Sequence, residues 1–176
     1  MMSITKPLQR DFSGKVAIIT GSSSGIGAEI AILFASYGAQ VVINGLDEIE
    51  VAQIAVRANE ESKKHYEAKN KKPLEASQIT GDVTDSTFAK KLIHQTVKRF
   101  GKLDILVNNA GAGCLGMVTD AKVMEHFDRI MKLNVRSVVE LTHLAVHFLE
   151  KTTGTIVNIG TILSVKPVTI PLYQII

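Results

Sequence analysis

The segment TGSSSGIG, at residues 20–27, combines glycines and small hydroxyl residues in the pattern of a phosphate-binding turn. It follows a short apolar run and precedes a helical pattern, so we expect it to join a strand to a helix. Glycines let such a turn approach a pyrophosphate closely, and the helix N-terminus presents free N–H groups and the positive end of the helix dipole. The spacing is Gly-x3-Gly-x-Gly rather than G-x-G-x-x-G. Taken alone, the segment therefore also fits a glycine-rich turn that binds another nucleotide or none.

Three further polar features lie where chemistry is possible. Asp82 follows the third predicted strand, the sequence NNAG at residues 108–111 follows the fourth, and Asn134 interrupts the apolar face of a helical pattern. Open α/β folds bind ligands at the carboxyl ends of their strands, where the first two features would lie. Both have alternatives, because Asp82 also suits a turn or a helix cap and NNAG suits an ordinary turn. Asn134 needs a specific hydrogen-bond partner, since a buried unpaired amide costs about 1–3 kcal/mol.

Short apolar runs alternate with longer helical patterns, which predicts an α/β fold with a doubly wound parallel sheet. The runs are continuously apolar rather than alternating, as expected for strands that helices cover on both faces. The whole chain, residues 1–176, is predicted to form a single domain. The five predicted strands are Val16 to Thr20, Gln40 to Asn44, Glu75 to Ile79, Ile105 to Asn108 and Thr155 to Ile159.

Two helical patterns have faces that can be assigned from residue spacing. The longest, about Ala121 to Glu150, separates a predicted core face that includes Asn134 from a polar face. In the pattern after the glycine-rich turn, the predicted core-facing stripe is Ile26, Ile30, Leu33, Phe34 and Tyr37.

In combination, these features resemble the short-chain dehydrogenase/reductase family. TGSSSGIG, GDV at residues 81–83, NNAG, the helix asparagine, and IVNIGT followed by a tyrosine occur in the family's order and at about its spacings. The resemblance implies a Rossmann fold with strand order 3-2-1-4-5 and with the C-terminal strands of the family missing. It implies that the pyrophosphate, adenine and adenosine ribose of a dinucleotide are bound by Gly21, Ser23, Ser24, Gly25, Ile26, Gly27, Asp82, Val83, Asn109, Ala110 and Gly111.

The resemblance also implies three catalytic residues. Asn134 would hold a water for a proton relay, Thr161 would orient a substrate carbonyl, and Tyr173 would exchange a proton with the substrate oxygen. The family has serine where Thr161 stands, and the extra methyl of threonine narrows the pocket. Ser164 is nearer in type but too close to Tyr173 in sequence. Thr161 as a loop hydroxyl and Tyr173 as a core tyrosine remain alternatives.

The sequence departs from the family at its last residues. The family's lysine stands four residues after the tyrosine, and this sequence stops three residues after Tyr173. The lysine lowers the pKa of the tyrosine, which is otherwise near 10 and too high for a general acid or base at neutral pH. We expect the chain to be the N-terminal part of a longer enzyme and the 176 residues alone to be inactive or nearly so.

The function implied is NAD(P)(H)-dependent oxidoreduction, with hydride transfer between the nicotinamide and a small alcohol or carbonyl substrate. The alternatives are a non-catalytic dinucleotide-binding fragment or short form, and a Rossmann-like methyltransferase. NADP(H) is favoured over NAD(H), because Gly45 stands where NAD-dependent members place an acid at the end of the second strand. Two features oppose this preference, since Leu46 and Ser24 are not the basic residues typical of NADP-dependent members and Asp47 lies nearby.

Composition excludes several other classes. The 176 residues are 45% hydrophobic and 21% charged, which is typical of a soluble globular domain. The net charge of +3 is too small and dispersed to indicate nucleic-acid binding. Cys114 is the only cysteine, which favours a reducing compartment, and no apolar run approaches the ~18 residues of a membrane span. The protein is predicted to be cytoplasmic.

No metal site is predicted. Glu140, His143 and His147 lie on one helix face, but they continue a polar stripe and no further ligands lie nearby in sequence. The whole protein is predicted to form a homo-oligomer, since the helix at residues 121–150 commonly belongs to the subunit interface in this family.

Overall fold

A five-stranded parallel sheet forms the centre of the fold, in a computed structural model that describes residues 11–113 and 119–161. The strand order is β3-β2-β1-β4-β5, and every neighbouring pair is parallel. This confirms the predicted doubly wound sheet and its order. The strands are β1 (Val16–Ile19), β2 (Gln40–Ile43), β3 (Ser77–Gln78), β4 (Ile105–Asn108) and β5 (Thr155–Asn158).

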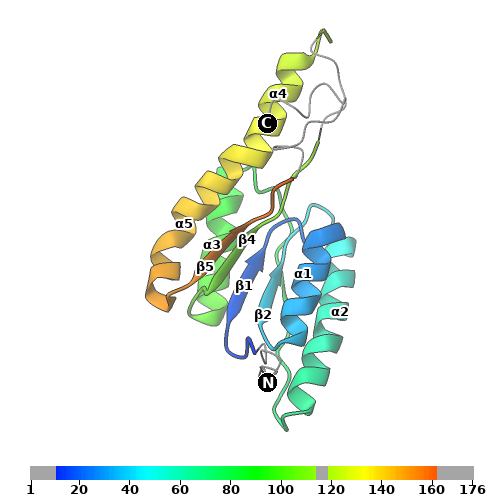
Figure 1. The fold of residues 1–176 in the computed structure, drawn as a ribbon, viewed down its shortest axis with the longest axis vertical. Helices are drawn as coiled ribbons and strands as arrows, with labels where there is room; N and C mark the ends of the chain where they lie inside the picture. The colour runs from blue at the N-terminus through cyan, green and yellow to red at the C-terminus, as the bar shows by residue number, and fades with distance from the viewer. Residues whose placement is uncertain (1–10, 114–118, 162–176) are drawn as a thin grey trace, which may run out of the picture.

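Helices cover both faces of the sheet, as Figure 1 shows. Helices α1 (Gly25–Ser36) and α2 (Glu48–Glu67) lie on one face, and α3 (Ser86–Phe100) and α5 (Ser137–Thr152) lie on the other. Helix α4 (Val123–Met131) extends the line of α5 beyond the carboxyl ends of the strands. Within the described ranges, no helix is long and apolar enough to cross a membrane.

The sheet separates two hydrophobic clusters, which explains the continuous apolar runs. Side chains alternate between the two faces of a strand, so Ile19 packs with α1 and α2 whereas Ile18 packs in the cluster of α3 and α5. Both are fully buried. A strand covered on both sides has no face on which a polar residue would meet water.

The predicted stripe on α1 was correct for Ile30 and Phe34, which are partly buried and pack against the core cluster, and wrong for Ile26 and Leu33. Ile26 is 65% exposed and Leu33 is 46% exposed. The buried residues of this helix are instead small ones, namely Gly27, Ala28, Ala31 and Ala35. Periodicity assigned the core face to the largest apolar side chains, but small side chains face the cluster that α1 shares with α2 and the sheet.

Two other expectations needed correction. The third strand is Ser77–Gln78, shorter than the predicted run Glu75 to Ile79. The helical pattern at residues 121–150 is interrupted by a π-helical segment at Lys132–Arg136, which separates α4 from α5. Its predicted core face is otherwise confirmed, since Ile130, Leu141 and Ala145 are buried.

Asp104 ties the start of β1 to the loop before β4. Its carboxylate accepts from the backbone N–H of Val16 at 2.9 Å and pairs with Lys15 Nζ at 3.1 Å and Lys102 Nζ at 2.9 Å. Burial by itself raises the pKa of this carboxyl, but the hydrogen bonds from Lys102, Val16 and Lys15 together outweigh it. The pKa of Asp104 therefore lies below its usual range.

We predict that Asp104→Asn lowers the free energy of unfolding by about 2 kcal/mol at pH 7, because it removes charge-assisted hydrogen bonds. A carboxyl whose pKa is lowered by folding stabilises the fold above its unfolded pKa, about 3.9, and loses this contribution as the pH falls toward its folded pKa. The difference between wild type and variant should therefore shrink below about pH 4. Urea unfolding at several pH values measures it.

Glu67→Gln serves as the control, because the Glu67 carboxylate lies 3.8 Å from Lys63 and both side chains are exposed. We expect this variant to change stability by less than about 0.5 kcal/mol. An Asp104→Asn effect as small as that of Glu67→Gln would contradict the role given to Asp104.

Candidate functional site

Most of the predicted site residues line one open cleft at the carboxyl ends of the strands. The β1–α1 turn contributes Gly21, Ser23 and Ser24 to its lining, the first turn of α1 contributes Ile26, and the π-helical segment contributes Asn134. Gly25 and Gly27 also belong to the first turn of α1 but are not part of this lining. Tyr173 lies outside the described residues. The other predicted residues that line the cleft are Asp82, Val83, Asn109, Ala110, Gly111 and Thr161.

The first turn of α1 packs tightly against the turn that precedes it. A Cβ built on Gly27 would lie 2.5 Å from the Gly21 carbonyl oxygen and would also collide with the Asn109 side-chain amide. Backbone at that distance cannot yield, so only glycine fits at residue 27. The TGSSSGIG spacing thus has a packing reason that is independent of any ligand.

The N-terminus of α1 lacks the side-chain cap that the neighbouring helices have. Asp47 and Asp85 accept hydrogen bonds from N–H groups in the first turns of α2 and α3. Ser24, the N-cap residue of α1, makes no such bond. The first turn of α1 is therefore the one of these three where N–H groups are left to an acceptor from outside the helix, such as a phosphate oxygen.

Asn109 and Thr20 join the end of β4 to the glycine-rich turn. Asn109 Nδ2 donates to the carbonyl oxygens of Thr20 at 2.9 Å and Gly21 at 3.0 Å. The buried Thr20 hydroxyl accepts from the backbone N–H groups of Asn109 and Ala110, both at 3.0 Å. The Asn109 side chain thus fixes the shape of the cleft wall, in addition to lining it.

The GDV segment has mixed roles. Asp82 Oδ1 accepts from the Thr84 backbone N–H at 2.8 Å, which is the turn chemistry noted as its alternative. Its side chain is nevertheless exposed and lines the cleft. Val83 is buried and packs in the cluster formed with α3 and α5, so it presents little surface to a ligand.

Asn134 has the specific partner that its place in an apolar stripe requires. Its Oδ1 accepts from the Ala112 N–H at 3.1 Å, and its Nδ2 donates to the Ala112 carbonyl oxygen at 2.9 Å. These two hydrogen bonds to one residue hold the segment after β4 against the π-helical segment. Such segments are frequent at functional sites, because the inserted residue changes the direction in which side chains point.

Several polar residues that support the cleft were missed by sequence reasoning. Asn44, only 1% exposed, follows β2, and its Nδ2 donates to the carbonyl oxygens of Ile79 and Gly81 at 3.1 Å each. The Ser22 hydroxyl accepts from the Asn44 N–H at 2.9 Å. The signal in the sequence is a polar residue directly after a buried apolar run, and the same signal marks Asn109.

A second missed pair lies at the ends of β4 and β5. Asn108 and Asn158 are register partners, and Asn108 Nδ2 donates to Asn158 Oδ1 at 2.9 Å. Both line the cleft, as does Thr161, which is an exposed residue. The cleft lining therefore contains a threonine and an asparagine pair from the end of β5 and the residues near it.

The lining carries charged residues at both of its ends. Asp47, Glu50 and Asp82 lie where β2 and β3 end, whereas Asp128, Arg129 and Lys132 come from α4 and the π-helical segment. Across residues 11–113 and 119–161, no group of three His, Cys, Asp or Glu side chains is arranged to hold a metal ion.

Comparison with known proteins identifies the family. Residues 15–173 match the sequence model described as "short chain dehydrogenase". An uncharacterized oxidoreductase of Thermotoga maritima is 38% identical over 152 residues, which are 86% of this chain and 55% of that protein. The chain therefore belongs to the short-chain dehydrogenase family, whose members bind NAD or NADP. It spans about half the length of the curated relatives it matches.

Solved structures agree with this assignment. The apo form of glucose dehydrogenase from Caenorhabditis elegans is 38% identical, with a TM-score of 0.70 over 86% of this chain and 56% of that one. A 7α-hydroxysteroid dehydrogenase complexed with NADH and 7-oxo glycochenodeoxycholic acid is 29% identical, with a TM-score of 0.78 over 94% of this chain and 60% of that one.

We predict that Asn134→Ala increases hydrogen exchange at the Ala112 amide, because the variant removes the acceptor of that N–H. Amide exchange followed by mass spectrometry or NMR measures the effect, and we expect an increase of about fivefold or more, as for the loss of roughly 1 kcal/mol of protection. Asn59→Ala is the matched control, since Asn59 Oδ1 accepts from the Ala76 N–H at 2.7 Å. It should affect Ala76 and leave Ala112 unchanged. Equal exchange rates of the Ala112 amide in wild type and Asn134→Ala would show that the hydrogen bond from this N–H to Asn134 does not protect it.

Proposed function

We propose that the protein is an oxidoreductase that transfers hydride between a nicotinamide dinucleotide and a small alcohol or carbonyl compound. The observation that carries the proposal is the β1–α1 turn, where an uncapped helix N-terminus opens toward the cleft. A dinucleotide pyrophosphate is an anion of the kind that such a terminus binds. Membership of the short-chain dehydrogenase family supports the same activity.

The residues around the turn fit a bound dinucleotide. In the proposed arrangement the turn at residues 21–27 holds the pyrophosphate, Asp82 and Val83 border the adenine, and Asn109, Ala110 and Gly111 border the adenosine ribose. The exposed side chain of Asp82 fits this role better than the buried Val83 does. The cofactor, when bound, supplies or accepts the hydride.

The remaining residues are proposed to handle the substrate and its proton. Thr161 keeps a hydroxyl on the cleft wall that can donate to a carbonyl oxygen. Asn134 is proposed to hold a water for the proton relay. Its side chain makes two hydrogen bonds to Ala112, so the backbone or the side chain of Asn134 would bind this water while those bonds are kept. Tyr173, outside the described residues, is proposed to exchange the proton with the substrate oxygen.

The nature of the dinucleotide depends on which charges reach the adenosine ribose. The sequence favours NADP(H) because Gly45 leaves no acid at the end of β2. The structure brings Glu50, an acid of α2, into the lining of the same cleft. The preference for NADP(H) was therefore based on an incomplete set of side chains.

A homo-oligomer and a cytoplasmic location are proposed for the whole protein. Val139 is 64% exposed and Val146 is 39% exposed on α5, as expected for a helix face that another subunit covers. The single cysteine of the sequence suits a reducing compartment.

We predict that Gly27→Val lowers the affinity for NADH at least about tenfold, because the new side chain displaces the turn that is proposed to hold the pyrophosphate. Fluorescence titration of the reduced cofactor measures the affinity. Gly101→Ala is the control, since Gly101 caps α3 with a φ of +77° and takes no part in the cleft. It should cost about 1 kcal/mol of stability and leave NADH affinity unchanged.

Circular dichroism must show that both variants remain folded. Equal NADH affinities of wild type and folded Gly27→Val would sink the proposed site, as would the failure of the folded wild type to bind any nicotinamide dinucleotide.

A further inference from the structure

We infer that Glu50 selects between the two dinucleotides, and that its carboxylate makes this protein favour NAD(H) by disfavouring the 2′-phosphate of NADP(H). The inference rests on the proposed function, since it concerns the adenosine end of the same cleft. It reverses the sequence-based preference for NADP(H), which considered the end of β2 but not the first turn of α2.

Glu50 is directed toward the glycine-rich turn by a direct contact. Its Oε2 accepts a hydrogen bond from the Ser23 hydroxyl at 3.1 Å, although the two residues are 27 apart in sequence. Both line the cleft. The contact therefore places a negative charge beside the turn that is proposed to hold the pyrophosphate.

The first turn of α2 explains why Glu50 is free to make this contact. Asp47 is the N-cap residue, and its Oδ1 accepts from the N–H groups of Ile49 at 2.8 Å and Glu50 at 3.0 Å. In a capping box the glutamate at this position bonds back to the N-cap residue. Here its carboxylate bonds across to Ser23 instead, while Asp47 keeps the helix end in place.

Gly45 makes room for this arrangement and explains why the acid comes from the helix. A Cβ at residue 45 would lie 2.5 Å from both Cβ and Oγ of Ser23 and 3.1 Å from Val51 Cγ2. An aspartate or glutamate at the end of β2 would therefore displace Ser23. The carboxylate of Glu50, which comes from α2, contacts Ser23 through the Ser23 hydroxyl.

The position suits a residue that reads the adenosine ribose. In nucleotide-binding folds of this type an acid about 20 residues beyond the glycine-rich turn hydrogen-bonds the ribose 2′-hydroxyl. Asp47 and Glu50 both fall near that spacing after Gly27. The capping bonds fix one Asp47 oxygen to α2, whereas Glu50 is held toward the turn by Ser23.

No basic side chain of the described lining lies at this end of the cleft to offset the acids. Arg129 and Lys132 belong to α4 and the π-helical segment. Arg57 of α2 is paired with Glu29 of α1 at 2.9 Å. A 2′-phosphate, with up to two negative charges, would thus meet Glu50, Asp47 and Asp82, whereas a 2′-hydroxyl can donate to a carboxylate.

The test compares NADH and NADPH affinities of the chain by fluorescence titration at low ionic strength. We expect wild type to bind NADH about tenfold or more tightly than NADPH, and Glu50→Gln to reduce this ratio about fivefold, in the range of one repelled charge near a surface. Glu50→Lys should bring NADPH affinity level with or above that of NADH. The ratio of the wild type should shrink as salt rises, because exposed charges are screened.

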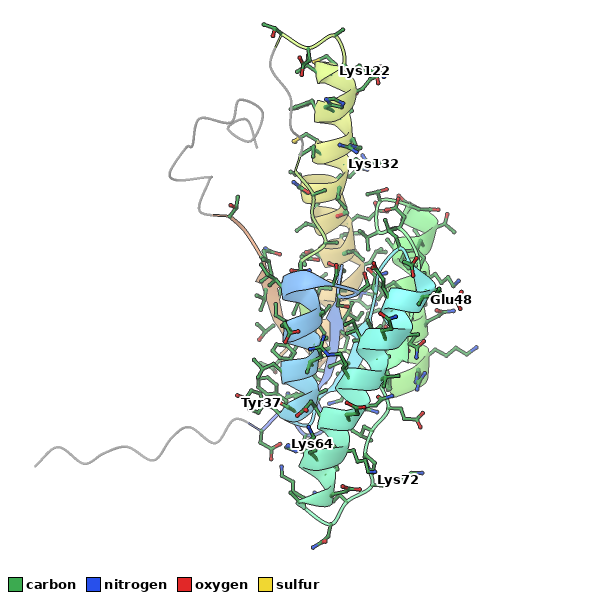
Figure 2. The ribbon with its side chains drawn as sticks, turned by 90° about the vertical axis from the view of Figure 1, so that its right-hand side faces the viewer. Tyr37, Glu48, Lys64, Lys72, Lys122 and Lys132 are labelled. Atoms are coloured by element: carbon green, nitrogen blue, oxygen red, sulfur yellow. The ribbon has the colours of Figure 1, made fainter. Side chains whose placement is uncertain are left out.

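Two matched variants separate Glu50 from its acidic neighbours. Glu48→Gln removes a charge from the first turn of α2, the turn that also holds Glu50. Figure 2 labels Glu48 at the end of α2 nearest α4, and Glu48 does not line the cleft. It should leave the ratio nearly unchanged. Asp47→Asn removes the other acid while asparagine keeps the helix cap. It should change the ratio less than Glu50→Gln does.

The outcomes are distinct. An unchanged ratio in Glu50→Gln, a wild type that binds NADPH as tightly as NADH, or a larger effect from Asp47→Asn each overturns this inference and leaves the proposed function standing. Failure of the folded wild type to bind either dinucleotide overturns both. The expected ratio, lost in Glu50→Gln and kept in Glu48→Gln, supports the role of Glu50.

Discussion

The Thr20 hydroxyl is the interaction on which the geometry of the cleft depends. It stands at the end of β1 with both lone pairs committed to the N–H groups of Asn109 and Ala110, and it donates to the Val107 carbonyl oxygen at 3.3 Å. These two N–H groups follow the last residue of β4. Without the hydroxyl, these two N–H groups would lose their acceptor, and the bonds from Asn109 Nδ2 would be left to hold the chain after β4 against the glycine-rich turn.

The same physical requirement recurs at the carboxyl ends of β2 and β4. Parallel strands satisfy their backbone groups against one another, but where the strands stop these groups lose their partners while still shielded from water. Asn44 and Asn109 replace those partners, because the Nδ2 group of each donates to two backbone carbonyl oxygens. These polar side chains therefore satisfy backbone groups beyond the strand ends. Only their polar atoms that are not used in this way can bind a ligand.

The fold was largely predictable because burial on both faces forces a continuous apolar run, which is readable in a single sequence. The size of the side chains that α1 buries was not predictable in this way. Helix α1 buries Ala31 and exposes Ile26, because small side chains allow the helix to pack closely. The site residues were predicted where glycines and strand ends mark them. Glu50 was missed because its role depends on a contact with Ser23 across 27 residues, and the partner of Asn134 was unknown because the π-helical segment leaves no mark in the spacing.

The π-helical segment makes the direction of the Asn134 side chain sensitive to the number of residues rather than to their type. A π-helical turn closes i→i+5 hydrogen bonds and therefore holds about one residue more than an α-helical turn. A variant with one residue fewer between Lys132 and Arg136 would close this segment into regular α-helix, and α4 and α5 would keep nearly the same faces relative to each other. The side chains inside the segment would be redirected, and the two hydrogen bonds between Asn134 and Ala112 would be lost. Insertions and deletions in this short segment are therefore an evolutionary route by which a chain of this fold could reshape one wall of its cleft in a single step.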